Sequence, residues 1–437
     1  MHTLYVSGGH PITGITGVPG SKNGALVLLA GCLLLEGETV LSGVPRTVDI
    51  HVFCQVMNAL GVQTRWLDGH TLSIRNDGLQ AEVVPLELAR KIRASTYVMG
   101  PLLAKCGEAR VPLPGGCNLG SRPIDLHLRA FEGLGALVHM EEDHAVGCVP
   151  GHLRGASLDV AGPQGSSMGA TVSAMLAAVT ARGETVIRRS AVEPEVSVLA
   201  RMLNQAGAKI QGIGTATLCI QGVAHLHGTD FEVPPDRVIA GTLLLAAAAT
   251  GGDVTLERFP PELLGDLPAV LNTMGVEVIL WRDAIRLAAS SRLRPVTTTA
   301  APFPGVATDL HPVLAAVLTM ADGTSQITDT VFPHRLAYLD ELRKMGARVK
   351  VEQNQVKITG GRRLAAAPVI ACALRAGTAL LVAGLAAGGM TRLGGIHHID
   401  RGWEGAERDL RALGADVERR TSAVAAPAAS EPARIAV

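Results

Sequence analysis

The fold is decided by a phrase that is clearest at residues 345–352, Met-Gly-Ala-Arg-Val-Lys-Val-Glu. A small or apolar residue, then Gly, then Val or Ala leads into alternating side chains, and the phrase occurs six times at separations of 68 to 74 residues. Each phrase follows a helical segment, so we expect Gly in the left-handed position after a helix and a strand beyond it. The six glycines are Gly61, Gly135, Gly207, Gly275, Gly346 and Gly414.

A second helical segment, rich in Ala, Leu, Gly and Val, lies midway in the repeats, as in residues 24–44 and 241–259. Such helices are apolar nearly all round and are therefore expected to be buried. Strands such as residues 347–352 alternate, which favours sheets with one wet face over a doubly wound parallel sheet. The sequence therefore predicts an α/β protein: a two-domain inverse α/β barrel of six βαβαββ-type repeats, three per domain, with internal helices and external sheets.

The chain of 437 residues is too long for one hydrophobic core. We expect one domain over residues 22–232 and a second over residues 1–21 plus 233–421. Residues 422–437 are rich in Ala, Pro and Ser and are expected to form a disordered tail. The longest apolar runs are shorter than the ~18 residues of a membrane span, and the start lacks a signal peptide, so a soluble cytoplasmic protein is expected.

Composition excludes several classes of function. Lys and Arg number 39 and so do Asp and Glu, which leaves no overall field to attract nucleic acid or a membrane. Only 3% of residues are aromatic, too few for base-stacking platforms. The seven cysteines are dispersed without a CxxC pair, which indicates neither a disulfide framework nor a zinc site, and six of them are expected to be small buried hydrophobes.

Two segments have the composition of a binding site. Residues 19–24 place Lys22 and Asn23 at the start of the first buried helix, where backbone donors favour an anion, although a simple capped helix start explains the same residues. Residues 113–127 are rich in Gly and Pro, as functional lids are. Arg122 near Cys117 would lower the pKa of the thiol and make it an acid, base or nucleophile; an inert loop cysteine is the alternative.

Charged side chains recur at the junctions between repeats. Arginine binds phosphate or carboxylate with two parallel hydrogen bonds, so several of these residues together would hold a small polyanion, whereas each alone would form a surface ion pair. The basic residues are Lys91, Arg93, Arg375 and Arg401. The candidate carboxylates are Glu193, Glu195, Asp236, Asp309 and Asp329; capping of a helix is the alternative for Asp236 and Asp309, and spacing alone selects none of the five as a base.

Several strings occur in a fixed order along the chain: SKNGA at residues 21–25, LPGGCNLGSRPIDLH at 113–127, SMGAT at 167–171 and HIDRGW at 398–403. With the repeat, they resemble the UDP-N-acetylglucosamine enolpyruvyl transferases, relatives of the enolpyruvyl shikimate phosphate synthases, over the chain up to about Arg420. The resemblance implies transfer of the enolpyruvyl group of phosphoenolpyruvate to an alcohol by addition and elimination, with release of phosphate and without a metal or organic cofactor.

The resemblance also implies roles for individual residues. Cys117 is expected to protonate or covalently trap phosphoenolpyruvate, and Asp309 to be the base for the acceptor hydroxyl. The phosphoenolpyruvate cage would comprise Lys22, Arg93, Arg122, Arg375 and Arg401, of which Lys22 and Arg401 are also expected to be catalytic. The nucleotide would contact Asn23, Arg122, Pro123, Ile124, Asp125, Leu126, Ser167, Met168, Gly169, Asp309, Val331 and Phe332. Nucleotide binding is expected to order the lid and close the two domains.

The sequence departs from the family pattern where acids are expected. Ala373 stands in place of the Asp of a DLRA motif, Ile239 in place of the Glu of a PDRIE motif, and Pro333 in place of the Glu of an FENR motif. Because the uridine and phosphoenolpyruvate positions persist, these losses favour a specialised paralogue resembling the enolpyruvyl transferases of nikkomycin/polyoxin-type antibiotic biosynthesis, with the 3′-hydroxyl of UMP as acceptor. The alternatives are a UDP-N-acetylglucosamine 1-carboxyvinyltransferase of peptidoglycan synthesis and a non-catalytic nucleotide-binding paralogue. The oligomeric state is left open.

Overall fold

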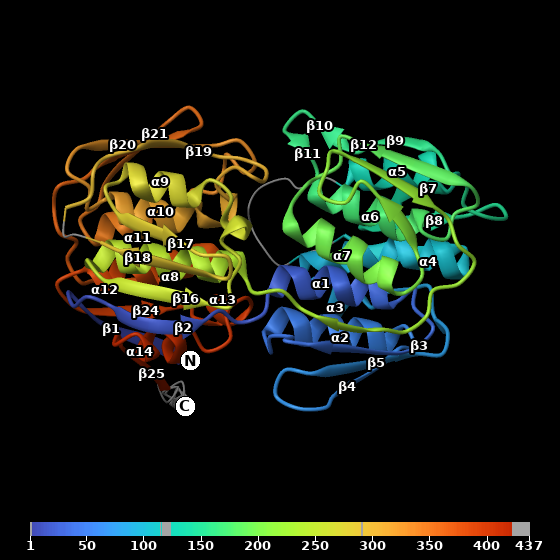
Figure 1. The fold of residues 1–437 in the computed structure, drawn as a ribbon, viewed down its shortest axis with the longest axis horizontal. Helices are drawn as coiled ribbons and strands as arrows, with labels where there is room; N and C mark the ends of the chain where they lie inside the picture. The colour runs from blue at the N-terminus through green and yellow to red at the C-terminus, as the bar shows by residue number, and fades with distance from the viewer. Residues whose placement is uncertain (1, 114, 116–123, 290–291, 422–437) are drawn as a thin grey trace, which may run out of the picture.

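The computed structural model describes residues 2–113, 115, 124–289 and 292–421. It contains two lobes that lie side by side, each around its own hydrophobic core (Figure 1). The core of the N lobe is drawn from residues 25–233, and the core of the C lobe from residues 4–12 and 238–417. The domain ends at residues 22, 232 and 421 stay predictions, and the tail at 422–437 lies outside the described residues.

Three sheets cover the N lobe, in the strand orders β15-β3-β5-β4, β6-β8-β7 and β13-β14-β12-β9. A two-stranded hairpin, β10-β11, projects beside them. The strands are β3 (Gly37–Ser42), β4 (Gln63–Trp66), β5 (Leu72–Asn76), β6 (Glu108–Pro112), β7 (Leu137–Glu141), β8 (His144–Cys148), β9 (Ser157–Asp159), β10 (Ala161–Gly162), β11 (Gly165–Ser166), β12 (Glu184–Arg188), β13 (Lys209–Gln211), β14 (Thr217–Gln221) and β15 (Asp230–Glu232).

Three sheets likewise cover the C lobe, in the orders β17-β18-β16-β2, β19-β20-β22-β21 and β23-β24-β1-β25. The strands are β1 (His2–Gly8), β2 (Thr13–Gly17), β16 (Asp253–Glu257), β17 (Glu277–Leu280), β18 (Ala284–Ala288), β19 (Thr297–Ala300), β20 (Thr324–Asp329), β21 (Arg348–Glu352), β22 (Gln355–Thr359), β23 (Pro368–Ile370), β24 (Gly389–Gly394) and β25 (Asp416–Thr421).

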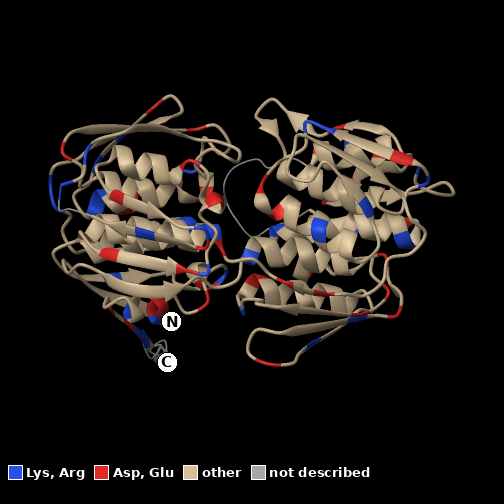
Figure 2. Ribbon diagram, in the orientation of Figure 1, with Lys and Arg blue, Asp and Glu red and all other residues tan. Residues whose placement is uncertain are grey.

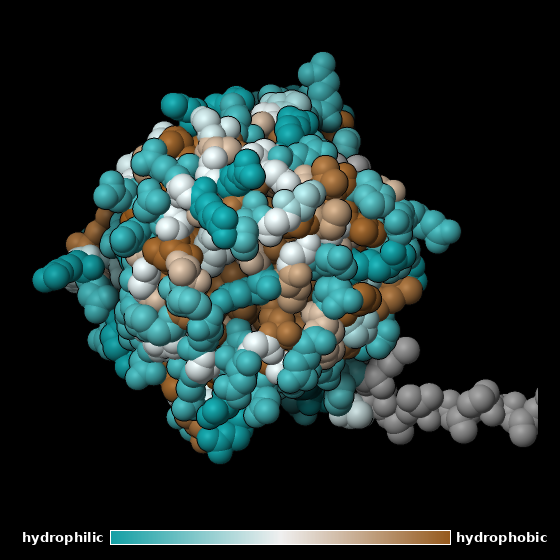
Figure 3. Space-filling view, turned by 90° about the vertical axis from the view of Figure 1, so that its right-hand side faces the viewer, coloured by the Kyte–Doolittle hydropathy of each residue, from teal (hydrophilic) through white to brown (hydrophobic). Residues whose placement is uncertain are grey.

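The sheets share one pairing pattern, which is the structural form of the sequence repeat. Five of them join one parallel edge pair to antiparallel strands; the parallel pairs are β3-β15, β9-β12, β2-β16, β19-β20 and β23-β24. In the sheet of β6, the parallel partner is reduced to a single bridge between Val83 and Arg110. Outer faces are mixed in character: on the face shown in Figure 3, hydrophobic residues are interspersed among hydrophilic ones.

Apolar helices with nearly every residue buried fill the space inside the sheets, as predicted for the inverse barrel (Figure 1). The N lobe contains α1 (Lys22–Cys32), α2 (Val48–Ala59), α3 (Leu86–Ala89), α4 (Met99–Cys106), α5 (Asp125–Gly133), α6 (Met168–Ala178), α7 (Pro194–Gln205) and the 3₁₀ helix η1 (Arg93–Val98). The C lobe contains α8 (Arg237–Thr250), α9 (Leu267–Thr273), α10 (His311–Leu318), α11 (Tyr338–Lys344), α12 (Leu374–Ala386), α13 (His397–Asp400), α14 (Ala406–Ala412), η2 (Pro261–Leu264) and η3 (Thr308–Leu310).

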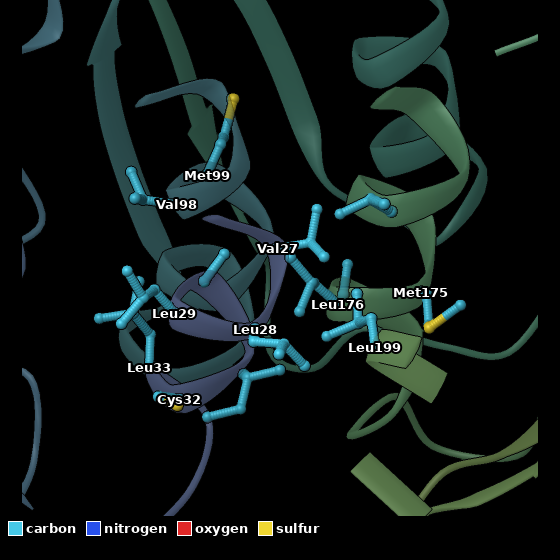
Figure 4. Close-up of a cluster of buried hydrophobic side chains, with 14 of the residues drawn as sticks. Val27, Leu28, Leu29, Cys32, Leu33, Val98, Met99, Met175, Leu176 and Leu199 are labelled. Atoms are coloured by element: carbon cyan, nitrogen blue, oxygen red, sulfur yellow. The ribbon is translucent and has the colours of Figure 1, made fainter. Parts of the chain in front are cut away.

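The central helices pack closely because their side chains are small. Figure 4 shows Leu28 of α1 on the side of Leu176 of α6 and Leu199 of α7, whereas Leu29 lies on the opposite side of α1, near Leu33. A Cβ atom on Gly31 of α1 would lie 2.9 Å from Leu199 Cδ1 and 2.7 Å from Met202 Cε, so Gly at this position permits the approach of α7. Small residues in the middle of each helix thus replace the aromatic bulk that the composition lacks.

Two sequence predictions about side chains come out differently. All six repeat glycines have positive φ, between 83° and 101°, as predicted for a left-handed residue after a helix. The prediction of six buried cysteines is wrong: Cys32 and Cys54 are buried, but Cys106, Cys148 and Cys372 are exposed. These three lie at the end of a helix, at the end of a strand and in a connecting loop, where neighbouring elements do not cover them. Among the described residues, no helix is both long and apolar enough to cross a membrane.

Gly346→Ala tests the backbone role of the repeat glycine. Gly346 has φ of 90°, and no atom lies within 4 Å of an added Cβ, so the substitution isolates backbone strain from steric clash. We expect a loss of about 1–2 kcal/mol in unfolding free energy, measured by urea denaturation. Gly346→Asn should lose less, because Asn tolerates the left-handed region. Equal losses for Ala and Asn would contradict the explanation.

Candidate active site

The start of α1 lies where the chain crosses between the lobes. Ser21 caps the helix, since its hydroxyl accepts from the backbone N–H of Gly24 at 3.0 Å. The returning crossover runs alongside: the N–H of Ser21 donates to the carbonyl of Pro234 at 2.7 Å, and that of Lys22 to Asp236 Oδ2 at 3.1 Å. Asp236 is itself the cap of α8, as its helix-capping interpretation expected. The two crossovers therefore bring the first residues of α1 and α8 together.

The side chain of Lys22 is part of a charge cluster that spans the lobes. Lys22 Nζ lies 3.2 Å from Asp49 Oδ2 on α2, and Arg401 Nε, in the C lobe, lies 2.9 Å from Asp49 Oδ1. We call Lys22, Asp49 and Arg401 the Asp49 cluster. All three side chains are largely buried, at 11%, 6% and 16% exposure. Two cations share this one carboxylate, and such a pair of cations favours a further anion beside them.

A second cluster forms around Asp309 in the C lobe. Arg375 Nε and Nη2 lie 2.9 and 2.6 Å from Asp309 Oδ2, and Arg335 Nη1 lies 2.7 Å from Oδ1. We call these residues the Asp309 cluster. Burial opposes the charge, but the guanidinium groups of Arg375 and Arg335 hold the pKa of Asp309 well below its usual range. Capping of a helix does not explain Asp309, since η3 is preceded by Ala307 in the cap position.

A buried ion pair also joins the lobes. Arg237 of α8 donates from Nε and Nη2 to Glu195 of α7, at 3.0 and 3.2 Å. Burial opposes the charge of Arg237, but the carboxylates of Glu195, Glu193 and Asp309 raise its pKa. Figure 2 shows acidic and basic residues gathered on the sides of the lobes that face each other. The interface is therefore held by charge pairs.

The predicted nucleotide contacts gather at the starts of α5 and α6. A Cβ on Gly169 would lie 2.9 Å from His127 Nε2, so the two helix starts are in close contact. His127 Nδ1 lies 2.8 Å from Ser173 Oγ, and burial together with the charge of Arg93 lowers the pKa of His127 to about 3. Arg93 thus faces the same place. Asp125 is exposed there, with a loose contact of 3.4 Å to Arg129.

The predicted site residues that the structure describes lie in three places: at Asp49, at Asp309, and at the starts of α5 and α6. Lys22 and Arg401 meet at Asp49, but Arg375 is bound to Asp309. Asn23 lies in the first turn of α1, and Val331 and Phe332 follow β20 near Asp309. Ile124, Leu126, Ser167 and Met168 lie at the starts of α5 and α6. Cys117, Arg122 and Pro123 lie outside the described residues.

Asp49 and Arg335 were missed by sequence reasoning. Asp49 reads as an ordinary acid in the first turn of α2, and Arg335 as one of many arginines. Neither has a local signal, because their partners are distant in the sequence. No group of three or more His, Cys, Asp or Glu that could hold a metal ion occurs among residues 2–113, 115, 124–289 and 292–421.

Ala373 lies at the start of α12, the helix that carries Arg375. It is the cap residue of α12, two residues before Arg375, and its side chain makes no capping hydrogen bond. A carboxylate at this position would cap α12. It would stand two residues before Arg375, which belongs to the Asp309 cluster. The substitution noted in the sequence therefore removes both a helix cap and a negative charge two residues before Arg375.

Two lobes of external sheets around internal helices, with arginine and lysine at their interface, are what the sequence resemblance predicts for an enolpyruvyl transferase. The chain belongs to the EPSP synthase (3-phosphoshikimate 1-carboxyvinyltransferase) family, whose model matches residues 6–410. Relatives named UDP-N-acetylglucosamine 1-carboxyvinyltransferase occur in Hyphomonas neptunium, 42% identical, and in Methylacidiphilum infernorum, 40% identical; each match covers 96% of this chain and 99% of the relative. The protein is therefore an enolpyruvyl (1-carboxyvinyl) transferase.

Solved structures confirm the predicted inverse α/β barrel. The enolpyruvyl transferase NikO from Streptomyces tendae is similar with a TM-score of 0.85 and 24% identity, over 97% of this chain and 99% of that one. An EPSP synthase from Acinetobacter baumannii is similar with a TM-score of 0.73 and 19% identity, over 96% and 100%. At these identities the likeness shows the fold alone.

Asp49→Asn tests whether the Asp49 cluster is an anion site. The variant leaves Lys22 and Arg401 without their shared carboxylate, so we expect a loss of about 3 kcal/mol in unfolding free energy. Inorganic phosphate should restore more stability to the variant than it adds to the unaltered protein, because the anion replaces the carboxylate. Scanning fluorimetry across a phosphate titration measures both effects.

The matched control is Asp253→Asn, which removes a carboxylate from an ion pair with Arg286 on an outer sheet. Its melting temperature and its response to phosphate should both stay close to those of the unaltered protein. A phosphate response of Asp49→Asn no larger than that of the control would argue against an anion site.

Asp309→Asn tests the depressed pKa. A carboxyl whose pKa is lowered on folding adds stability above its unfolded pKa of about 3.9, and this stability is lost as pH falls through the folded pKa. The variant should therefore melt below the unaltered protein by a constant margin from about pH 5 to 8, and the margin should shrink only in more acidic solution. A margin that already closes between pH 5 and 7 would contradict the ion pairs with Arg335 and Arg375.

Proposed function

We propose that this enzyme transfers the enolpyruvyl group of phosphoenolpyruvate to a hydroxyl of UDP-N-acetylglucosamine. Relatives bearing that name share 40–42% of residues over 96% of the chain, which supports this acceptor. The observation that carries the catalytic part is the Asp49 cluster, where cations from two lobes meet at one carboxylate. A site divided in this way suits a small polyanion that is enclosed when the lobes close.

The reaction needs a proton donor, a proton acceptor and positive charge. C3 of phosphoenolpyruvate gains a proton, the acceptor oxygen bonds to C2 as its hydroxyl proton leaves, and the ketal then loses C3–H as a proton and the C2–O bond to phosphate. Cys117 is our candidate donor, on the sequence resemblance. Lys22, Arg401 and Arg93 would stabilise the phosphate and carboxylate charges, a preorganised electrostatic effect that commonly supplies the largest share of catalysis.

Asp309 is the proposed base, and its surroundings suggest how it is activated. A carboxylate held by two guanidinium groups binds a proton weakly, so Asp309 is a poor base while both arginines remain. Phosphoenolpyruvate has more anionic oxygens for Arg375 to bind than the carboxylate of Asp309 has. If Arg375 turns to the substrate, Asp309 keeps only Arg335 and its pKa rises. This exchange reconciles the proposed roles of Arg375 in substrate binding and of Asp309 as base.

The nucleotide is proposed to bind across the starts of α5 and α6. Backbone N–H groups at the first turn of α6, at Ser167 to Gly169, point to where a nucleotide phosphate would gain from the helix dipole. The exposed carboxylate of Asp125 would accept from the uracil N–H, between the apolar side chains of Ile124 and Leu126. Val331 and Phe332, beside the Asp309 cluster, would contact the sugar.

UMP is the second candidate acceptor, favoured by the cap residue Ala373. The family carboxylate is absent at position 373, two residues before Arg375, which we assign to the acceptor side of the proposed site. The predicted nucleotide-binding residues 122–126 keep the family sequence. An acceptor without a sugar diphosphate needs fewer contacts on the acceptor side. The identity to the UDP-N-acetylglucosamine relatives outweighs this single position.

An acceptor comparison decides between them. Protein is incubated with phosphoenolpyruvate and either UDP-N-acetylglucosamine or UMP, and phosphate release is followed. We expect kcat/KM to be at least roughly tenfold higher with the sugar nucleotide. Arg401→Gln should abolish release, whereas Arg392→Gln, an exposed arginine of β24, should not. Faster release with UMP selects the second candidate; thermal stabilisation by nucleotide without release from either would indicate a nucleotide-binding paralogue.

A further inference from the structure

A buried polar chain lies directly behind the Asp309 cluster. Asp329, at the end of β20, accepts from His311 Nδ1 at 3.0 Å, and His311 Nε2 lies 3.0 Å from the hydroxyl of Tyr338 on α11. Each of these three residues is 1% exposed. Titratable groups this deep are expensive to bury and are retained where their hydrogen bonds are satisfied. We call Asp329, His311 and Tyr338 the Asp329 chain.

Both oxygens of Asp329 are fully used. Oδ1 accepts from the backbone N–H groups of Val331 and Phe332 at 2.9 and 2.8 Å, and Oδ2 accepts from the Thr308 hydroxyl at 2.6 Å as well as from His311. Burial opposes the charge, but the bonds from His311, Thr308 and the N–H of Phe332 hold the pKa of Asp329 below its usual range. The carboxylate is therefore ionised and fixed in direction.

The ionised carboxylate of Asp329 decides which group donates and which accepts in each hydrogen bond of the Asp329 chain. His311 must carry its proton on Nδ1 to donate to Asp329, so in the neutral ring Nε2 accepts from Tyr338. Burial and the nearby charge of Asp329 raise the pKa of the Tyr338 hydroxyl, which keeps it a donor. With the neutral Nδ1–H tautomer, each bond has one direction, and the three side chains hold one arrangement.

The contacts of Asp329 lead to the proposed base. Thr308 precedes Asp309, and Arg335 Nη1 donates both to the Thr308 carbonyl at 2.8 Å and to Asp309 Oδ1 at 2.7 Å. One carboxylate therefore restrains the η3 segment that carries Asp309 and the residues 331–332 that are proposed to contact the acceptor. Apolar residues would fill the same buried volume without fixing these two segments to each other.

We propose that the Asp329 chain is a positioning device that sets the proposed base, Asp309, against the acceptor-binding segment 331–332. Asp329 and His311 are positioning residues, since neither reaches the site itself. The inference rests on the proposed base role of Asp309. Its consequence is that loss of the His311 to Asp329 bond lowers turnover of the acceptor far more than it changes phosphoenolpyruvate binding, which rests on Lys22 and Arg401 of the Asp49 cluster as well as on Arg375.

Two substitutions at one position test the bond. His311→Asn keeps an N–H near the place of Nδ1, whereas His311→Leu, of similar size, has none; both lose the contact with Tyr338. We expect His311→Leu to lower kcat about tenfold or more and to raise the acceptor KM, with the phosphoenolpyruvate KM within about twofold, because small displacements of a base are costly. His311→Asn should recover most of kcat. Equal kcat in the two variants would overturn the proposal.

Ile327→Ala is the control for lost stability. Ile327 is fully buried in β20 two residues before Asp329 and makes no polar side-chain contact, so its truncation should lower the melting temperature with little change in kcat. A fall in kcat as large as that of His311→Leu would reduce the Asp329 chain to a structural role. If the His311 variants do not fold, Thr308→Val and Thr308→Ser make the same comparison from the other donor, and equal kcat again overturns the proposal.

Asp309→Asn separates this inference from the function on which it rests. Loss of turnover in Asp309→Asn, with unaltered turnover in His311→Leu, would remove the positioning role alone. Retained turnover in Asp309→Asn would remove the base role, and the inference with it.

Discussion

The proposed active site depends on one carboxylate that holds two cations from different lobes. Asp49 accepts from Lys22 of its own lobe and from Arg401 of the other, in surroundings that are largely closed to water. Without it, the two cations would repel each other at the lobe interface; with it, they stay close and keep a surplus positive charge. The fold serves this contact, because the paired crossovers at Ser21 and Pro234 bring the start of α1 to the interface.

Both charge clusters follow the same electrostatic logic. Each has two cations on one carboxylate, and so each satisfies its charges before a substrate arrives while remaining positive overall. An incoming anion then exchanges partners with a carboxylate, which costs less than stripping water from exposed guanidinium groups. For the Asp309 cluster the exchange has a chemical consequence, since releasing Arg375 strengthens the base. Substrate binding and activation of Asp309 would be one event.

The fold was predictable from sequence because its signal is local and repeated. The glycine after each helix needs positive φ, and the helices need small apolar residues, so both leave marks at every repeat. The site was predictable only where the family resemblance supplied it. Asp49 and Arg335 carry no local mark, since an acid in a first turn and an arginine after a strand are ordinary. The exposed cysteines were predicted wrongly because cysteine is usually a buried residue type. Cys106, Cys148 and Cys372 lie at the ends of helices and strands or in a loop, where no neighbouring element covers them.

The choice of acceptor is where sequence identity and local chemistry point in different directions. Identity of 40–42% along nearly the whole chain reflects many positions, most of which build the repeat and its core. Ala373 is only one position, but it lies two residues before Arg375. Arg375 is the cation that we propose moves from Asp309 to the substrate. A carboxylate at position 373 would add a negative charge to the start of α12, two residues before Arg375. Among the described residues, Asp309 is the carboxylate partner of Arg375, so the proposed exchange with substrate acts directly on the base. The loss can therefore be compatible with either acceptor, because it acts on the strength of the base as well as on the sugar.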